Sequence, residues 1–151
     1  MPQRSIPQLS LTDFVDIVST SGIPKATKIR QLKKRLSYNP AADFYKRIRE
    51  NIVVAHQDNH QKAYLDRTLT GLTDQKKKTA YPQLATEYKK WWGNKSFTWF
   101  DPPPNVHYSK HGVSIAVNPE LGLIINGTPH LIKLYFKLDP LAKSRGDIIH
   151  I

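Results

Sequence analysis

VNPELGLIINGTPHLIKLYFK, residues 117–137, is the segment whose pattern predicts the most structure. Asn126-Gly127 separates two runs of alternating apolar residues, and both residues tolerate the positive φ that a type I′ hairpin turn requires. A third alternating run comes just before this segment. The predicted strands are Val113–Val117, Leu121–Ile125 and Leu131–Lys137. We therefore expect a three-stranded antiparallel meander with at least one face covered by helices.

The chain before this meander has apolar residues at helical spacing. Ser10-Leu11-Thr12-Asp13 has the spacing of a capping box, with Asp in place of the usual Glu. A helix that runs to about residue 57 is predicted to bury Phe44, Ile48, Ile52 and Ala55. A shorter helix is predicted around Leu65, and another from Thr73 to Trp92, capped by Thr73 and closed by Gly93. The predicted fold class is α+β: an N-terminal helical bundle, then a small antiparallel β-meander and a C-terminal helical segment.

At 151 residues the chain suits one compact domain, and we predict a single domain over residues 1–151. Its helical part spans about 10–93 and its β part about 97–138, with three prolines at 102–104 between them. The last segment, 141–151, ends on apolar residues. That ending indicates either a segment that docks on the sheet or a missing C-terminal part.

Composition excludes several classes of protein. There is no cysteine, which rules out disulfides, thiolate zinc sites and a cysteine nucleophile. Asp13 and Asp16 interrupt the apolar part of the N-terminal segment, which argues against a signal peptide. No apolar run approaches the ~20 residues of a membrane span. We expect a protein of the bacterial cytoplasm that does not contact membranes.

Positive charge is the strongest compositional signal. The chain has 23 Lys and Arg against 12 Asp and Glu, a formal net charge of +11. Such an excess favours a polyanionic partner, and DNA or RNA is the leading candidate. The candidate nucleic-acid-binding residues come from a predicted helix at 25–35, a lysine triplet and one tryptophan. They are Lys25, Lys28, Arg30, Lys33, Lys34, Arg35, Lys76, Lys77, Lys78 and Trp92.

The predicted helix at 25–35 has a narrow apolar stripe, Ile29, Leu32 and Leu36. With that stripe turned inward, its cations other than Arg30 are expected to project outward. The basic helix and the triplet form one patch if they share a side of the molecule, and two solvated faces if they do not. The sequence leaves this alternative open.

Two other groups of residues have spacings that suggest chemistry. Trp91, Trp92 and Trp99 lie among lysines. This pattern is typical of proteins that bind single-stranded nucleic acid, in which aromatic rings stack on the bases and lysines contact the phosphates. Adjacent Trp91 and Trp92 point roughly 100° apart on a helix, so we expect one in the core and one partly exposed.

His56 and His60 have the spacing of a zinc pair on a helix, but Asp58-Asn59 between them favour a helix end. His107 and His111 repeat that spacing in a predicted strand or loop, where it does not converge. We predict no metal site from either pair.

Pro119-Glu120-Leu121, the hairpin and the lysine-bearing strand resemble the core of the PD-(D/E)XK metal-dependent nucleases. In that family two carboxylates hold a divalent cation and a lysine assists the attacking water. The resemblance implies Glu120 as the first acid, Lys133 or Lys137 as the lysine, and Mg²⁺ as cofactor. The second acid is missing, because Leu131 and Tyr135 stand two positions before the lysines.

The same hairpin is similar to bacterial proteins that carry a VNPELGL…IKLYFK signature, a resemblance that brings no activity with it. We therefore predict a non-catalytic nucleic-acid-binding or adaptor protein without a cofactor. One alternative is a Mg²⁺-dependent nuclease. The other is a protein-interaction module in which the apolar second face of the sheet, or residues 148–151, docks a partner or a missing segment.

Overall fold

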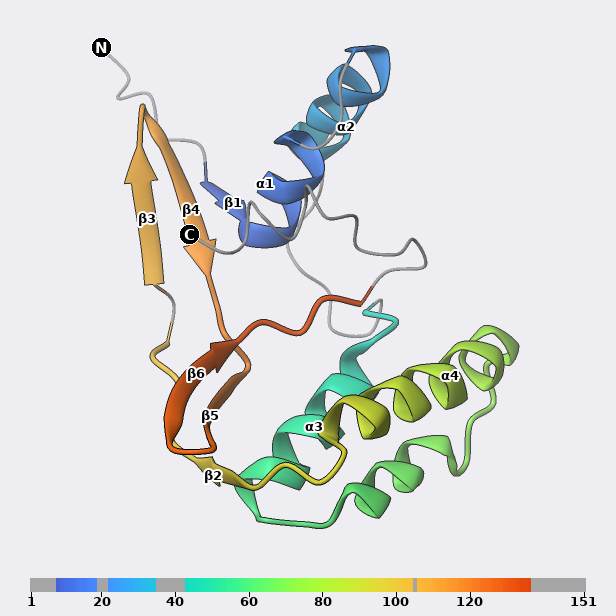
Figure 1. The fold of residues 1–151 in the computed structure, drawn as a ribbon. Helices are drawn as coiled ribbons and strands as arrows, with labels where there is room; N and C mark the ends of the chain where they lie inside the picture. The colour runs from blue at the N-terminus through green and yellow to red at the C-terminus, as the bar shows by residue number, and fades with distance from the viewer. Residues whose placement is uncertain (1–7, 19–21, 35–42, 105, 137–151) are drawn as a thin grey trace. The chain divides into compact units, whose positions relative to one another are not determined.

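The computed structural model describes residues 8–18, 22–34, 43–104 and 106–136 (Figure 1). Helices predominate in its N-terminal part and strands in its C-terminal part, so the α+β prediction is confirmed. The elements are β1 Gln8–Ser10, α1 Leu11–Val18, α2 Gly22–Lys34, α3 Lys46–Gln57, the 3₁₀ helix η2 Lys62–Leu69, α4 Gln75–Trp92, β2 Phe97–Trp99, β3 Val106–Lys110, β4 Val113–Val117, β5 Leu121–Ile125 and β6 Thr128–Ile132. The predicted C-terminal helical segment, 141–151, lies outside the described residues.

The chain divides into two compact units. Unit 1 comprises residues 1–38, 103–118 and 135–151; unit 2 comprises 39–102 and 119–134. Each unit contains one three-stranded sheet, with strand order β1-β4-β3 in unit 1 and β2-β5-β6 in unit 2. Among the helices described, none combines the length and apolar character that crossing a bilayer requires.

The hairpin at Asn126-Gly127 is confirmed, but the predicted three-stranded meander is wrong. β5 and β6 pair as antiparallel neighbours around Asn126 (φ 50°) and Gly127 (φ 84°). β6 starts at Thr128 and ends at Ile132, earlier than predicted. The second edge of β5 pairs with β2, so no edge of β5 remains for β4. β4 instead pairs antiparallel with β3 and parallel with β1.

In unit 2, apolar side chains from helices and sheet form the core. The fully or nearly buried residues are Ile48, Ile52, Ala55, Leu65, Tyr81, Ala85, Trp92, Leu121 and Leu123. The predicted buried face of α3 is confirmed for Ile48, Ile52 and Ala55, which repeat at spacings of four and three, whereas Phe44 precedes the helix and is half-buried. Close packing also fixes Gly122, because a Cβ there would lie 2.3 Å from the carbonyl oxygen of Phe100.

Both ends of α4 are set by local chemistry. Asp74, rather than the predicted Thr73, is the N-cap, and its carboxylate accepts hydrogen bonds from the backbone N–H groups of Lys76 (2.8 Å) and Lys77 (3.2 Å). Gly93 follows the last residue with φ 52°, as predicted. The helix continues through Pro82.

In unit 1, the Ser10 cap of the predicted capping box at the start of α1 is confirmed, but the Asp13 carboxylate accepts from the Ser10 hydroxyl rather than from the Ser10 backbone N–H. The Ser10 hydroxyl donates to Asp13 Oδ2 (2.8 Å) and accepts from the Asp13 backbone N–H (3.1 Å). α1 buries Val15 together with two carboxylates, Asp13 and Asp16. Asp16 is paired with Lys28 of α2 (3.5 Å) and accepts a hydrogen bond from the Tyr135 hydroxyl (3.5 Å). The α1 core therefore contains charges as well as apolar residues.

Candidate nucleic-acid interface

The basic helix α2 presents fewer of its cations outward than the sequence predicts. Lys25 and Lys28 are half-buried like Ile29 and Leu32, because all four share one face at spacings of three and four. Lys28 turns to the buried carboxylate of Asp16. Arg30 is exposed. The side chains of Lys33 and Lys34, and the whole of Arg35, lie outside the described part of the chain.

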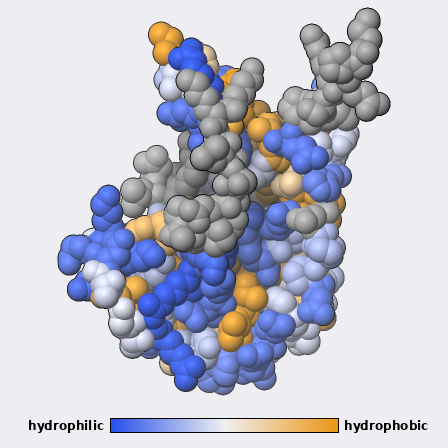
Figure 2. Space-filling view, turned by 180° about the vertical axis from the view of Figure 1, so that it is seen from behind, coloured by the Kyte–Doolittle hydropathy of each residue, from blue (hydrophilic) through white to orange (hydrophobic). Residues whose placement is uncertain are grey.

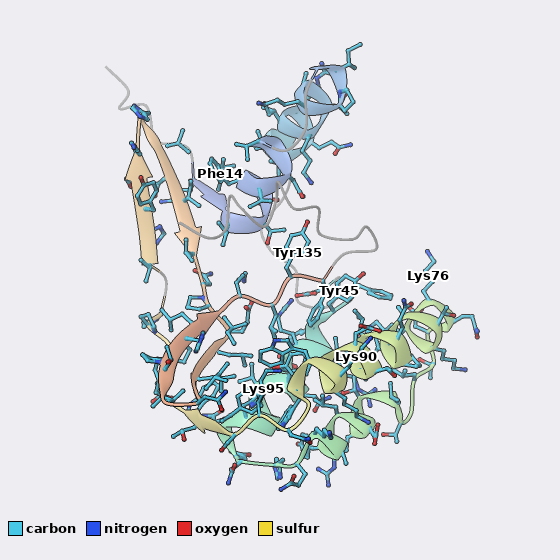
Figure 3. All side chains as sticks on the ribbon, in the orientation of Figure 1. Phe14, Tyr45, Lys76, Lys90, Lys95 and Tyr135 are labelled. Atoms are coloured by element: carbon cyan, nitrogen blue, oxygen red, sulfur yellow. The ribbon has the colours of Figure 1, made fainter. Side chains whose placement is uncertain are left out.

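The lysine triplet occupies the first turn of α4. Lys76 and Lys78 are exposed, and Figure 3 shows Lys76 extending away from the helix. Lys77 is half-buried, with its ammonium 5.7 Å from the Phe44 ring centroid and 5.9 Å from that of Tyr81. Cations are unfavourable at a helix N-terminus, where the backbone dipole favours negative charge. An anionic ligand at this end would relieve that repulsion.

The other end of α4 joins cations to aromatic rings. Residues 88–100 contain three lysines, six aromatic residues and no acid. The Lys95 amine donates to the carbonyl of Trp91 and lies 5.1 Å from the Trp91 ring centroid. The Lys62 amine donates to the carbonyl of Gly93 (3.1 Å). These two amines compensate the negative end of the helix dipole, and that structural role would itself account for their positions.

Carboxylates neutralise only part of the positive charge. Among the described residues, the lysine and arginine pairs with carboxylates include Lys28–Asp16, Lys46–Glu50, Arg49–Asp43, Lys89–Asp66 and Lys133–Glu120. Other cations have no carboxylate partner within the described residues: Lys25, Arg30, Lys76, Lys78, Lys90 and Lys110. Hydrophilic residues cover much of the lower part of the face in Figure 2, with small apolar patches between them.

The hairpin brings Glu120 and Lys133 together, and both carboxylate oxygens of Glu120 have partners within the protein. Glu120 Oε1 lies 2.5 Å from the Lys133 amine, and Oε2 accepts from the backbone N–H of Leu134 (2.7 Å). The Glu120 N–H in turn donates to the carbonyl of Ile132 (3.0 Å). Across the described ranges no group of three or more His, Asp or Glu residues is placed to hold a metal ion. Lys137 lies outside those ranges.

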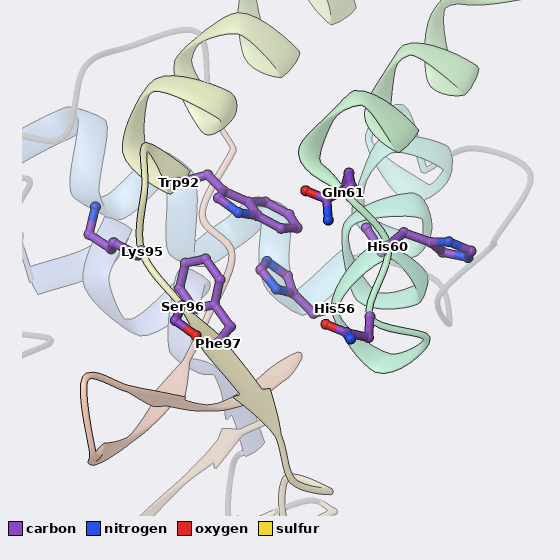
Figure 4. A pocket seen from close by; sticks show the side chains of 9 residues that line it. His56, His60, Gln61, Trp92, Lys95, Ser96 and Phe97 are labelled. Atoms are coloured by element: carbon purple, nitrogen blue, oxygen red, sulfur yellow. The ribbon is translucent and has the colours of Figure 1, made fainter.

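Unit 2 also contains a pocket of about 240 Å³ where the ends of α3 and α4 meet the start of β2 (Figure 4). Its lining is Ala55, His56, Asn59, His60, Gln61, Trp92, Lys95, Ser96 and Phe97. The His56 ring stacks on Trp92 with centroids 4.2 Å apart and meets Phe97 edge-on at 4.8 Å. His56 Nε2 lies 2.9 Å from the Tyr88 hydroxyl oxygen.

Burial sets the protonation of this pair. It lowers the pKa of His56 to about 4, so the imidazole is neutral at pH 7. It raises the pKa of Tyr88, so the phenol keeps its proton. Since His56 Nε2 is the only acceptor for that proton within the described residues, we assign Tyr88 as the donor. The His56 proton is then on Nδ1, which has no hydrogen-bond partner in the described part of the chain.

The structure separates residues that the sequence placed together. His60 follows the end of α3 at Gln57, stacks on Tyr64 at 4.2 Å and points away from His56 (Figure 4), so the pair does not converge. Of the two tryptophans, Trp92 is buried and Trp91 is 38% exposed, as predicted. Because Trp92 is buried and Trp91 is partly exposed, a ligand on the outer surface of α4 would stack on Trp91 rather than on Trp92.

The pocket itself was missed from the sequence. Gln61, Trp92 and Phe97 belong to no shared sequence motif, and they meet only because the segment between α3 and η2 packs near the end of α4 and the start of β2. One signal was present: His56 directly follows the buried Ala55 and stands four residues after Ile52, on the apolar face of its helix.

Comparisons with known proteins give no further identification. No family model, curated protein or solved structure matches this chain.

Proposed function

We propose that this protein binds nucleic acid without cleaving it, and that α4 of unit 2 provides the main contact surface. The observation that carries the proposal is the set of α4 cations without a carboxylate partner in the described residues: Lys76, Lys78 and Lys90. A cation whose charge is not neutralised within the fold is available to a phosphate. The proposed contact is mainly electrostatic, with counterion release from the backbone as its driving force.

Aromatic residues near these cations favour a single-stranded ligand. Trp91 is partly exposed beside Lys90 and Lys95, and a base can stack on such a ring while a lysine meets the adjacent phosphate. Arg30 of α2 is a further candidate contact in unit 1. Both oxygens of Glu120 are engaged within the hairpin, which favours binding over metal-dependent hydrolysis.

Fluorescence anisotropy with labelled single-stranded DNA, measured at several salt concentrations, tests this proposal. Affinity is expected to fall steeply with salt. Replacing Lys76, Lys77 and Lys78 together by Gln is expected to reduce the slope of log K against log [salt] by ~0.7 for each phosphate that these side chains neutralise. In 0.1 M salt the same relation predicts an affinity about fivefold weaker for each such phosphate.

Lys46→Gln is the matched control, because Lys46 is a lysine of the same unit that pairs with Glu50 four residues away (2.6 Å). It is expected to leave both affinity and slope nearly unchanged. Absent binding, or binding that does not depend on salt, would overturn the proposal. An equal effect of Lys46→Gln would show that net charge, rather than the α4 surface, determines binding.

A further inference from the structure

The pocket around His56 has the dimensions and chemistry of a site for one small planar ligand. Its volume of about 240 Å³ is below the roughly 300–1,000 Å³ of pockets that hold drug-sized molecules. Aromatic side chains, Trp92 and Phe97, form part of its wall. A ligand that fits must therefore be small, and a flat ring can lie against these side chains.

Two side chains of the pocket lining, His56 and Gln61, have hydrogen-bonding groups that could bind such a ligand. The Nδ1–H of His56 is a donor without a partner in the described residues, and it stays neutral because the pKa is about 4. Gln61 is the N-cap of η2, yet its side chain makes no capping hydrogen bond. In Figure 4 its amide points toward Trp92 and His56. A neutral donor and an amide suit a ring that carries carbonyl oxygens and N–H groups.

Cations lie beside this neutral pocket. Lys95 is part of its lining, although its side chain points away from the rings in Figure 4. Lys62 follows Gln61 directly, and its amine reaches the carbonyl of Gly93, the residue after Trp92. A ligand with a planar neutral ring and an attached phosphate therefore meets ring-binding and charge-binding groups together.

We propose that this pocket receives a single base of the bound strand, a pyrimidine with its carbonyl oxygens toward His56 and Gln61, while Lys62 and Lys95 contact the flanking phosphates. The proposal rests on the proposed function, because it assigns a base site to the same nucleic-acid ligand. Reading an unstacked base by hydrogen bonds and ring contacts is the general solution for single strands.

The test compares two labelled oligonucleotides of equal length, an oligothymidylate and a strand with abasic sites, by anisotropy on the full chain. The wild-type protein is expected to bind the oligothymidylate about tenfold more tightly than the abasic strand, because a single base contact contributes about 1–3 kcal/mol and 1.4 kcal/mol corresponds to a factor of ten. His56→Phe keeps a buried ring and removes the donor. It is expected to lower oligothymidylate affinity about three- to tenfold and to leave abasic binding unchanged.

Gln61→Leu is the second variant, chosen because the exposed Gln61 side chain does not cap its helix, so the fold does not depend on it. It is expected to lower affinity for the oligothymidylate alone. Gln57→Leu is the matched control, because Gln57 is an exposed glutamine at the end of α3 that does not line the pocket, and it is expected to have no effect. Equal affinity of the wild-type protein for both strands overturns the base site and leaves the proposed function standing. Failure to bind either strand overturns both.

Discussion

The two units of this protein differ in what their described residues bury. Unit 2 contains nearly all the buried apolar residues of helices and sheet, from Ile48 to Leu123. Unit 1 contributes Val15 and Ile115, and it buries Asp13, Asp16 and Ser114 beside them. Apolar burial stabilises a fold by roughly 1.5–3 kcal/mol per large side chain, whereas a buried carboxylate needs partners to avoid a cost.

Among the described residues, both units contain paired and unpaired cations, so the difference bears only on the basic helix of each unit, α2 and α4. In unit 1, Lys28 forms an ion pair with the buried Asp16, so part of the positive charge of α2 is neutralised within the fold. In unit 2, hydrophobic packing holds α4 in place, and Lys76, Lys78 and Lys90 have no carboxylate partner among the described residues. A charged surface on a helix fixed by apolar packing is better suited to a defined ligand contact.

The largest expected effect tests the core of unit 2. Ile52→Ala removes a fully buried side chain and is expected to destabilise unit 2 by about 2–5 kcal/mol. Tryptophan fluorescence during urea unfolding measures this selectively, because Trp91, Trp92 and Trp99 all lie in unit 2. Val15→Ala in unit 1 is the comparison, and it is expected to change the far-UV circular dichroism more than the tryptophan transition. An equal shift of the tryptophan transition would show that the two units unfold as one.

A second test uses pH. The pKa of His56 is about 4 in the folded protein and 6.5 when exposed, so the unfolded state binds more protons between these values. Stability is therefore expected to fall as the pH decreases from 6.5 to 4, by about 3 kcal/mol in total. The urea midpoint of the tryptophan signal, followed with pH, measures it. His56→Phe should flatten this dependence; a flat wild-type profile would contradict the burial of His56.

The sequence predicted local structure better than strand pairing. The hairpin turn, the Ser10 cap of α1, the apolar face of α3 and the end of α4 at Gly93 all follow from interactions within a few residues, and all are confirmed. The meander prediction was wrong because β2, which lies more than 20 residues earlier in the chain, pairs with the second edge of β5. The periodicity of the residues near 120 does not indicate this long-range pairing. The β3–β4 hairpin was also missed, because its turn is His111-Gly112 rather than a common turn pair.

The candidate site shows the same limit. The cations of α4 and the exposure of Trp91 were predictable from composition and helical geometry. The orientation of Lys28 was not, because it depends on Asp16 from another helix. The pocket requires three elements to meet, and only the tertiary structure brings His56, Gln61 and Phe97 together.

A third test asks what Glu120 does in the unit 2 hairpin. Glu120→Gln removes the charge that binds Lys133 and the Leu134 N–H, and it is expected to cost about 1–3 kcal/mol of stability. Glu87→Gln, at an exposed acid of α4 without an ion pair in the described residues, is the control and should have no effect. Mg²⁺-dependent cleavage of DNA by the wild-type protein, abolished by Glu120→Gln, would instead establish the nuclease alternative.

The smallest expected effect compares matched turns in the two units. Both hairpins have two-residue loops with positive φ, His111 (51°) and Gly112 (76°) in unit 1, Asn126 (50°) and Gly127 (84°) in unit 2. A Cβ at either glycine would meet no atom within 4 Å, so alanine there costs only backbone strain, about 1 kcal/mol. Gly127→Ala is expected to lower the tryptophan transition by that amount, and Gly112→Ala to leave it unchanged. Equal shifts from the two variants would show that the strain in unit 1 reaches the core of unit 2, and the distinction between the units would then not extend to their stability.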